Sequence, residues 1–468
     1  MSPLISVYIT NYNYARFLKK AIDSVLSQSF HDFELLIIDD GSTDDSKNII
    51  EGYASNPKIK IIYQHNKGLN VTNNIAIRAA SGKYIIRLDA DDYFVSNALE
   101  QMSGKLEANP ELGMVFPNYY YIDEKDQVTG EEVRHDFDNN KVSLLDQPAH
   151  GACTMIRTDF LNEIGGYDES FNCQDGYELW IKFTQRYEVS NLREPLFYYR
   201  KHGSNLTSNE EMILQTRAKI NQKYINKLQT NNNTLAIIPI RGGDKDLAFQ
   251  TINGVNILTA KINMLLRSKY VEKIIVSSPD SRIENYIMPY KTKKNVLFHF
   301  RNETEARIND NLNATIFDIS NKFANKLANI TIITLEYPLI RQEHIDDAIN
   351  TMALFGTDSI VSVRPDNAIF YQHHGDGLHP ILNRDKFTKL EREALFKQLG
   401  GITAVRKAAF DESKQMLCGK VGHVVIDQKA GLGLFSSIDF EIISDIVKKN
   451  QSSNDSNHVI KKRASSGL

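Results

Sequence analysis

Three carboxylates stand together directly after an apolar, strand-like stretch of the sequence. In "KYIIRLDADDYFVS", residues 83–96, they are Asp89, Asp91 and Asp92. Ligands of parallel α/β sheets gather at the carboxyl ends of the strands, and grouped carboxylates repel one another unless a cation neutralises them. Mg²⁺ and Mn²⁺ prefer oxygen ligands and often share them with phosphates. The stretch therefore predicts a site for a metal ion and a diphosphate, with the N-terminal cap of a helix as the alternative.

The elements that must position this cluster alternate regularly along the first half of the chain. β-rich runs are followed by helical patterns such as residues 15–28 and 70–80. The β-rich runs are residues 4–10, 33–39, 59–64 and 83–89. This alternation is typical of a parallel sheet built from βαβ units.

The alternation stops at the Asn-rich residues 229–234 and then begins again. New strand-like runs occur at residues 235–240, 273–278, 329–335 and 358–363. We therefore expect two consecutive Rossmann-like nucleotide-binding α/β domains. The expected bounds are residues 1–228 and 235–450, with a polar linker at 229–234 and a disordered tail at 451–468.

The composition excludes several classes of protein. Of the 468 residues 41% are hydrophobic and 24% are charged, and the formal net charge of -3 argues against nucleic-acid binding. No apolar run approaches the roughly 20 residues of a membrane helix, so we expect a cytoplasmic protein. Cys153, Cys173 and Cys418 have no metal-binding spacing and are expected as free thiols. The basic residues 461–463 would allow at most peripheral contact with the inner face of a membrane, and an inert tail is the alternative.

Five motifs follow one another in the first half of the chain. They are "ISVYITNYNYARFLKKAIDSVLSQSF", "LLIIDDGSTDDS", "ASGKYIIRLDADD", "IGGYDESFNCQDGYELWIKF" and "YYRKHGSNLT". In this order they resemble the first strand and nucleotide-contacting turn, the base-binding turn, the metal-binding signature, the acceptor and catalytic-base segment, and the diphosphate-closing segment of the family 2 glycosyltransferases. The resemblance covers residues 1–225 and implies the GT-A fold of that family.

The resemblance implies a nucleotide site at the ends of the first two strands. Thr10, Tyr12 and Asp39 would surround the nucleoside base. An Asp side chain that accepts the imide N–H of uracil favours a UDP- or dTDP-sugar as the donor. An ordinary surface aromatic is the alternative for Tyr12, and Asp40 would serve the turn by bonding its amides.

The resemblance also implies a metal ion beside the diphosphate. Asp89 would lie near the ribose or the metal, and Asp91 would bind Mn²⁺ or Mg²⁺ with Asp92 adjoining. The ion would neutralise charge that develops on the departing nucleoside diphosphate. His202 resembles a further metal ligand of some family members, and Arg200 would contact the diphosphate. A solvated histidine and a surface arginine are the alternatives.

An inverting transfer needs a base that takes the proton of the acceptor hydroxyl. The resemblance assigns this role to Asp175, which belongs to a pair that is usually Glu-Asp in the family and is Gln174-Asp175 here. The alternative for Asp175 is the cap of the helix that follows it. The residues expected on the acceptor side are Gly166, Glu178 and Trp180, and Trp180 is equally suited to the hydrophobic core.

The second half opens with "LAIIPIRGGDKD", a strand-like run followed by a Gly-rich loop. This and later stretches, over residues 234–448, resemble the cytidylyltransferases that activate acidic sugars such as sialic acid or Kdo, whose loop covers the phosphates of CTP. Asp244 and Asp246 stand where a Ser and a basic residue are usual, so like-charge repulsion opposes a triphosphate. Arg241 and Lys245 would still bind an anion, or belong to a solvated surface loop.

These features predict a metal-dependent inverting glycosyltransferase with an inactive second domain. It would move a sugar from a UDP- or dTDP-sugar to a hydroxyl of a glycan or lipid-linked acceptor in surface polysaccharide biosynthesis. The second domain would be retained for homodimer formation, acceptor binding or scaffolding. The alternatives are a bifunctional glycosyltransferase and CMP-sugar synthetase, and a non-catalytic glycan-binding or assembly scaffold.

Overall fold

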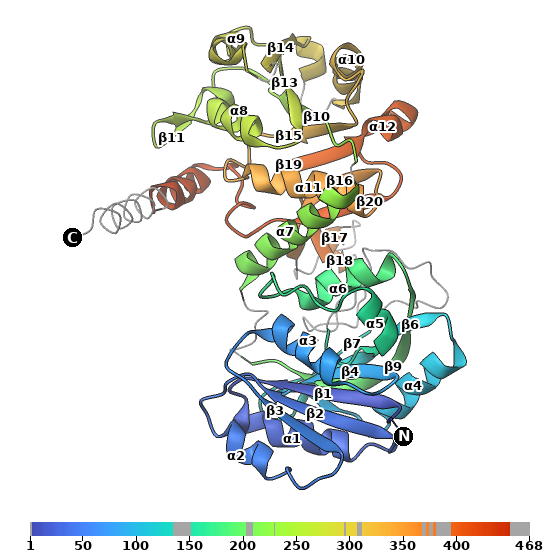
Figure 1. Ribbon diagram of the computed structural model, residues 1–468. Coiled ribbons are helices and arrows are strands. Elements are labelled where there is room, and N and C mark those ends of the chain that lie inside the picture. The colour runs from blue at the N-terminus through green and yellow to red at the C-terminus, as the bar shows by residue number, and fades with distance from the viewer. Residues whose placement is uncertain are drawn as a thin grey trace, which may run out of the picture. The chain divides into compact units, whose positions relative to one another are not determined.

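The computed structural model describes residues 2–133, 151–202, 209–228, 230–293, 296–306, 311–366, 371–373, 378–380 and 395–449. The chain divides into two units (Figure 1): the first is residues 1–217 with 368–393, and the second is residues 218–367 with 394–468. The division falls within helix α7 (Glu210–Leu228), before the predicted linker. The tail expected to be disordered, residues 451–468, lies outside the described residues.

The first unit contains the expected parallel sheet. Four parallel strands lie in the order β3-β2-β1-β4. They are β1 (Ile5–Asn11), β2 (Phe33–Asp39), β3 (Ile59–Tyr63) and β4 (Tyr84–Asp89), which confirms the four predicted strands. Thr10 pairs with Asp89 and Asn11 with Asp39 in this register. The predicted site residues of three strands therefore stand at one edge of the sheet.

The sheet continues beyond β4 with strands that the alternation does not predict. They are β8 (Met155–Arg157), β6 (Leu112–Ile122), β9 (Glu188–Arg200) and β5 (Tyr93–Phe94), with β7 (Val128–Glu132) paired to β6. β8 and β5 run antiparallel to their neighbours. The sequence does not predict this direction, because a run of apolar residues fits parallel and antiparallel pairing alike. The pairing of β5 with the end of β9 brings Arg200 to Asp92, 108 positions earlier.

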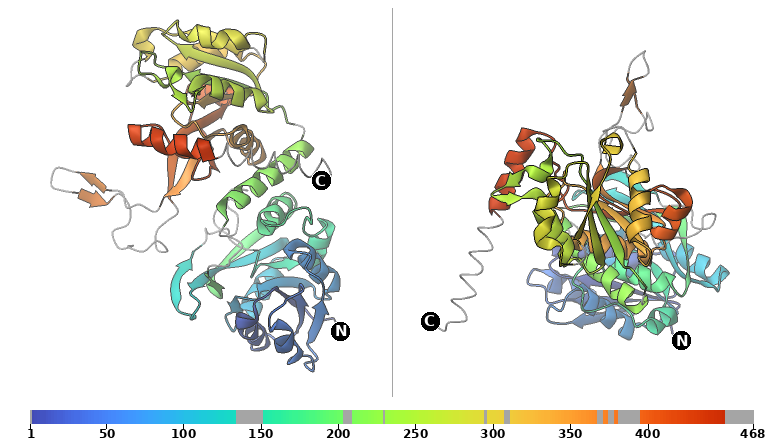
Figure 2. Two further views of the ribbon diagram at one scale, coloured as in Figure 1. Left: turned by 90° about the vertical axis from the view of Figure 1, so that its left-hand side faces the viewer. Right: turned by 90° about the horizontal axis from the view of Figure 1, so that it is seen from above.

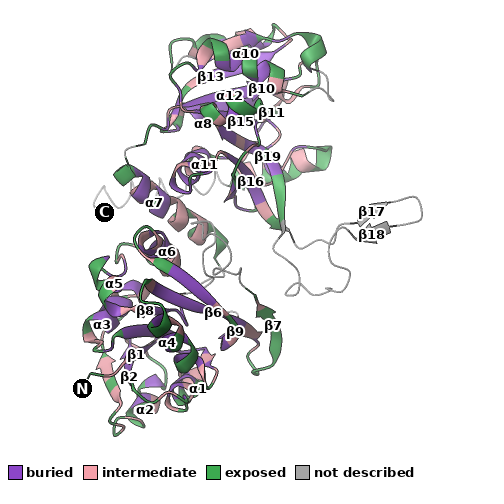
Figure 3. Ribbon diagram, turned by 90° about the vertical axis from the view of Figure 1, so that its right-hand side faces the viewer, coloured by how far each residue is buried: buried purple, intermediate pink, exposed green. Residues whose placement is uncertain are grey.

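Helices cover both faces of this sheet and bury two hydrophobic clusters. One cluster includes α1 (Ala15–Leu26), α2 (Ser46–Glu51) and α4 (Ala98–Ala108), and the other includes α3 (Leu69–Ala79), α5 (Thr158–Glu163) and α6 (Asp175–Thr184). The buried side chains of α1 recur at helical spacing, as Leu18, Ile22 and Val25 illustrate. The helices predicted at residues 15–28 and 70–80 are confirmed, and Figure 3 shows the inner strands as buried.

The second unit is a separate α/β fold with a seven-stranded sheet in the order β14-β13-β10-β15-β19-β16-β20. Its strands are β10 (Thr234–Pro239), β13 (Val271–Ser278), β14 (Val296–Phe300), β15 (Asn329–Ile333), β16 (Ser359–Asp366), β19 (Leu395–Arg406) and β20 (Val421–Val425). β19 runs antiparallel to both neighbours, and the predicted strands β10, β13, β15 and β16 are confirmed.

Helices lie on both faces of this second sheet (Figure 2). They are α8 (Ile257–Arg267), α9 (Ile283–Ile287) and α11 (Gln342–Leu354) around one hydrophobic cluster, and α10 (Asn313–Phe323) and α12 (Lys407–Ser413) around another. Short elements complete the description: η2 (Leu247–Phe249), η3 (Met288–Tyr290), η4 (Glu303–Ala306), β11 (Thr251–Ile252), β12 (Val255–Asn256), β17 (Tyr371–His373) and β18 (Leu378–Pro380). Among the helices that the structure describes, none is both long and apolar enough to cross a membrane.

A buried carboxylate joins three strands of the first unit at the end opposite the predicted site. Glu34 of β2 is 6% exposed and accepts hydrogen bonds from Ser6 Oγ of β1 (2.6 Å), from Lys60 Nζ of β3 (2.6 Å) and from Ser81 N (2.7 Å), just before β4. Burial alone would raise the pKa of Glu34, but Lys60, Ser6 and Ser81 lower it from 4.5 to about 2. The ionised side chain therefore stabilises the folded unit.

We expect Glu34→Gln to lower the free energy of unfolding of the first unit by about 1.5–3 kcal/mol at pH 7, because charge-assisted hydrogen bonds to buried groups are lost. Because the pKa of Glu34 is lower in the folded than in the unfolded chain, its ionised side chain stabilises the folded unit fully above pH 4.5. This contribution disappears as the pH falls towards 2. The difference between variant and wild type should shrink over that range. Urea titrations followed by the fluorescence of Trp180, the single tryptophan of the chain and part of this unit's core, measure it.

The matched control is Glu107→Gln, which removes an exposed carboxylate paired with Lys83 in the same unit. Exposed pairs contribute less than about 1 kcal/mol. A Glu34→Gln effect that is constant between pH 7 and 3, or no larger than the control, would contradict the assignment.

Candidate active site

A cavity of about 840 Å³ opens in the first unit where β1 and β4 end. Its wall includes the turns after these strands, the start of α6 and part of α7. The predicted site residues that line it are Thr10, Tyr12, Asp89, Asp91, Asp175 and His202. Those that the structure places outside its lining are Asp39, Asp92, Gly166, Glu178, Trp180 and Arg200.

The two aspartates at the end of β2 have different surroundings. Asp39 is buried and accepts hydrogen bonds from Asn11 Nδ2 (2.7 Å) and from Ser42 Oγ (2.5 Å). Asp40 lines the cavity, but its Oδ1 accepts hydrogen bonds from Gln64 Nε2 (2.7 Å) and the backbone N–H of Lys67 (2.8 Å), and its Oδ2 accepts the N–H of Gly68 (2.9 Å). Both carboxylates therefore hold backbone at this end of the sheet: Asp39 the turn after β1, and Asp40 the loop after β3.

The aspartates after β4 form a crowded and largely buried group. Burial, opposed by the charge of Arg87 and reinforced by that of Asp91, raises the pKa of Asp89 to about 6. Burial and the charges of Asp91 and Asp89 raise the pKa of Asp92 well above its usual value. Asp92 is 1% exposed, and its Oδ2 accepts no hydrogen bond from any residue that the structure describes. The described basic side chains therefore do not fully neutralise the negative charge of this group.

His202 lies directly against this group. Its Nε2 is 2.9 Å from Asp91 Oδ2. The imidazole ring packs against the aromatic rings of Tyr14 and Phe17, with centroid distances of 5.7 Å and 5.8 Å. The structure thus brings together Asp91 and His202, two of the three predicted metal residues, although 111 positions separate them; the third, Asp92, lies outside the lining of the cavity.

The donor set fits a divalent cation that takes its remaining ligands from a substrate. No three or more His, Cys, Asp or Glu side chains within the described ranges are grouped to hold a metal by themselves. Asp91 and His202 offer an oxygen and a nitrogen on the cavity wall, a combination that suits Mn²⁺ and is compatible with Mg²⁺. The unsatisfied Oδ2 of Asp92 and the raised pKa values indicate charge that a cation would neutralise.

Arg200 lies behind the aspartates. It is 1% exposed, and its Nε donates to the carbonyl of Asp91 (2.8 Å) while its backbone N–H donates to Asp92 Oδ1 (2.9 Å). Its Nη2 donates to Asp126 (2.5 Å), and its guanidinium lies over the ring of Phe17 at 4.4 Å. These contacts hold the backbone of the metal-binding turn, a role that the sequence does not reveal.

The predicted base stands at the start of a helix. Asp175 is the first residue of α6 and lines the cavity. The preceding Gln174 has a φ of 62°, in the left-handed region, and its Oε1 accepts a hydrogen bond from Arg217 Nε of α7 (2.6 Å). Arg217 also lies over the ring of Tyr177 at 5.1 Å, and both residues line the cavity next to the base. Sequence patterns do not single out these two residues.

A buried arginine separates the two groups of carboxylates. Arg87 of β4 is 4% exposed, and its Nε lies 2.9 Å from Asp89 Oδ1. Its Nη1 donates to Asp175 Oδ2. The only signal in the sequence is a single basic residue within the mainly apolar strand "YIIRLD".

The residues predicted for the acceptor side are part of the scaffold. Gly166 has a φ of +62°, and its carbonyl accepts a hydrogen bond from Lys182 Nζ (2.6 Å). Glu178 is buried and pairs with the same lysine at 3.7 Å. Trp180 is buried against Phe116 in the hydrophobic core, as in one of the two expected roles. These residues therefore support α6 on the side away from the cavity. The periodicity of the helix alone does not show which of its faces meets the core and which meets the cavity.

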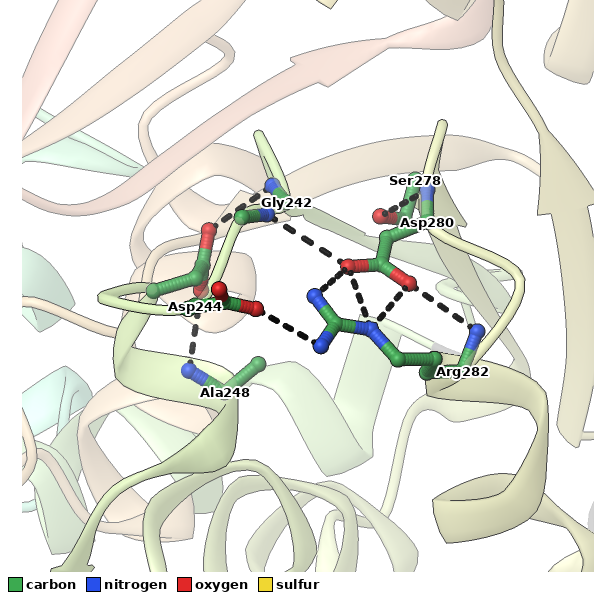
Figure 4. Close-up of polar contacts among 8 residues, drawn as sticks. Gly242, Asp244, Ala248, Ser278, Asp280 and Arg282 are labelled. Carbon is green, nitrogen blue, oxygen red and sulfur yellow. Dashed lines mark hydrogen bonds and ion pairs between the residues drawn. The ribbon is translucent and has the colours of Figure 1, made fainter.

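The Gly-rich loop of the second unit is closed by its own carboxylates (Figure 4). The N–H of Gly242 donates to Asp246 (2.9 Å), and the N–H of Gly243 points to Asp280 (3.4 Å). Arg282 pairs with both Asp280 (2.6 Å) and Asp244 (2.7 Å). The residues predicted to bind an anion, Arg241 and Lys245, are exposed. The backbone donors that would meet a phosphate are therefore already used.

The order of these features in the chain is that of a known enzyme class. The model of the family described as "Glycosyl transferase family 2" matches residues 6–165. An uncharacterised glycosyltransferase of Nostoc sp. is 30% identical over 245 residues, which are 47% of this chain and 74% of that protein. The chain is a glycosyltransferase. It belongs to family 2 of these enzymes.

Other relatives are much longer than the matched part. The chondroitin synthase of Escherichia coli is 29% identical over 46% of this chain and 31% of its own length. The hyaluronan synthase of Pasteurella multocida is 23% identical over 85% of this chain and 43% of its own length. The solved structure of S. aureus TarS 1–349 in complex with UDP-GlcNAc matches with 21% identity and a TM-score of 0.40, over 48% of this chain and 67% of that chain. A TM-score at this level carries no weight for the fold or the donor.

We expect no binding of CTP to the loop of the second unit, because its amides donate to Asp246 and Asp280. Calorimetric titration of the full chain with CTP and Mg²⁺ should show no saturation below about 1 mM. The control is the variant Arg241→Ala/Lys245→Ala. Tighter binding that is lost in this variant would contradict the prediction, whereas binding that both proteins share would belong to the cavity of the first unit.

Proposed function

We propose that the first unit transfers a sugar, with inversion at the anomeric carbon, from a UDP- or dTDP-sugar to a hydroxyl of a glycan acceptor. One observation carries the proposal: a single cavity of about 840 Å³ is lined both by the Asp89, Asp91 and His202 group and by Asp175. That volume lies in the range of sites for ligands of this size. A cation site and a candidate base therefore meet one bound donor.

The nucleoside end of the donor would lie against Thr10 and Tyr12. Asp39, at the end of β2, would accept the imide N–H of uracil or thymine, while Asp40 holds the loop after β3 through the amides of Lys67 and Gly68. Cytosine has no N–H at that ring position, so a carboxylate there disfavours CMP-linked donors. This supports a UDP- or dTDP-sugar.

Asp91 and His202 would hold Mn²⁺ or Mg²⁺ together with oxygens of the diphosphate. When bound, the ion supplies positive charge next to the leaving group. Asp92 and Arg200 keep the turn in place through the hydrogen bond between the Arg200 N–H and Asp92 Oδ1. The chain thus contributes a fixed pair of ligands and a rigid backbone.

Asp175 would act on the acceptor. Its carboxylate takes the proton of the acceptor hydroxyl while that oxygen bonds to the anomeric carbon and the bond from this carbon to the diphosphate oxygen breaks. The bonding electrons leave with the nucleoside diphosphate. Attack from the face opposite the leaving group inverts the anomeric centre.

The acceptor would approach past Tyr177 and Arg217. An aromatic ring is a suitable platform for a sugar ring, and a guanidinium next to it suits hydroxyl or acidic groups. Relatives named as chondroitin and hyaluronan synthases support a glycan acceptor in polysaccharide biosynthesis, although this chain spans less than half of either. For the second unit, the closed loop at Gly242 favours support of the first unit over synthesis of a CMP-sugar.

We expect release of nucleoside diphosphate from UDP- or dTDP-sugars in the presence of Mn²⁺, and no release from GDP- or CMP-sugars. Asp91→Ala should lower the rate at least about 100-fold, because the transition-state charge loses its neutralisation. Chelation by EDTA should have the same effect and be reversed by added Mn²⁺. A luminescent assay of released nucleotide over a donor panel measures this. The matched control is Asp32→Ala, at an exposed position of the same unit. Release that persists in Asp91→Ala would refute the metal site.

We expect Asp175→Asn to lower the turnover number about 10²–10⁴-fold with little change in donor affinity, because the amide removes the general base. Donor affinity is measured by calorimetry with the UDP-sugar found in the panel. The control is Asp159→Asn, which makes the same change in the first turn of another helix, α5. If both variants lose stability alike and neither loses turnover, Asp175 only stabilises the first turn of α6 and is not the base.

A further inference from the structure

Arg87 is an unusual residue for its place in the fold. It lies in the middle of β4, between Tyr84 and Asp89, in a strand whose other side chains are mainly apolar. Burial alone would lower the pKa of Arg87, but the charges of Asp89 and Asp175 raise it well above its usual value. The side chain is therefore a permanent cation beneath the cavity, and it lines the cavity wall.

We infer that Arg87 is a positioning residue that sets the catalytic carboxylate of Asp175 relative to the donor end of the site. The inference rests on the proposed function, in which Asp175 is the base. Arg87 does not need to touch the substrate for this role, because it acts through the two carboxylates that it holds.

The contacts define a bridge between the two ends of the site. Nε of Arg87 lies 2.9 Å from Asp89 Oδ1, and Nη2 donates to Asp89 Oδ2 (3.5 Å). Nη1 donates to Oδ2 of Asp175. A planar guanidinium presents its donors in a fixed geometry, so one side chain fixes both carboxylates relative to each other. Holding Oδ2 of Asp175 leaves Oδ1 of the same carboxylate to take the proton.

The bridge is itself held in place. The backbone of Arg87 is paired with Tyr8 of β1, and its carbonyl accepts the N–H of Cys153 (2.8 Å). A Cβ at Gly151 would lie 3.1 Å from Nη2 of Arg87 and 3.1 Å from Oδ2 of Asp175. Backbone without a side chain thus lies directly against the ion pair.

Two roles make different predictions for the same variants. If Arg87 contributes to turnover only by neutralising Asp89, its loss and the loss of the base are independent, and their effects on turnover multiply. If Arg87 acts by positioning Asp175, its removal has no further effect once Asp175 can no longer act as a base. A double-mutant cycle on turnover separates these cases.

The experiment compares wild type, Arg87→Met, Asp175→Asn and the double variant, with turnover and donor affinity measured for the full chain and the donor identified by the panel. We expect Arg87→Met to lower the turnover number about 100-fold, the cost of a misplaced catalytic group, with a donor Kd within about threefold of wild type. The double variant should be no slower than Asp175→Asn. Arg87→Lys, which keeps the charge but not the two-sided contact, should recover only part of the loss.

Each outcome decides a different point. Losses that multiply in the double variant, or an Arg87→Lys protein with full turnover, would overturn the positioning role while leaving the proposed transfer intact. A wild-type protein that transfers sugar from no donor would overturn both. If Arg87→Met does not fold, the same cycle is measured with Arg87→Lys, and losses that multiply there would overturn the positioning role in the same way.

Discussion

The active site depends on the concentration of negative charge where β4 ends. Asp89, Asp91 and Asp92 follow one another at the edge of a sheet, and burial raises the pKa of Asp89 and Asp92. Such a group is stable only with cations close to it. Two arginines provide part of this charge from inside the fold, Arg87 on the side of the cavity and Arg200 behind the turn. The negative charge that they leave uncompensated is what a divalent cation would neutralise, with oxygens of the donor diphosphate as its further ligands.

The same constraint explains why the sheet is mixed. The four parallel strands supply residues to the site only as far as β4. The short antiparallel pairing of β5 with β9 brings residues from a distant part of the sequence next to the aspartates. That return places Arg200 under the turn and His202 beside Asp91. The antiparallel pairing of β5 with β9 therefore brings the proposed second metal ligand, His202, to Asp91.

Sequence patterns identify the four parallel strands of the first unit, the helix that begins at Asp175 and the carboxylates after β4, because each of these is encoded by local spacing. They do not fix the direction in which a side chain points once a strand ends. Asp39 and Asp40 are adjacent, yet Asp39 bonds Asn11 and Ser42 in the turn after β1, whereas Asp40 accepts the amides of Lys67 and Gly68 in the loop after β3. Glu178 and Trp180 fail as cavity residues for the same reason, since the face of α6 that contains them packs on the core. Arg87 escapes notice because its partner Asp175 is 88 positions away and only the fold brings them together.

The second unit shows the opposite use of the same chemistry. Its first strand also ends in a glycine-rich turn, and Gly242 and Gly243 both have positive φ values that expose backbone N–H groups. In the first unit carboxylates at this edge of the sheet are left for a cation, whereas here Asp246 and Asp280 accept the amides and Arg282 neutralises Asp280 and Asp244. The glycine N–H groups of this loop have hydrogen-bond acceptors without any ligand. A triphosphate would have to displace these carboxylates, which have the same sign of charge. The glycine-rich turn of the second unit thus has the N–H groups of Gly242 and Gly243 directed at carboxylates of the same unit.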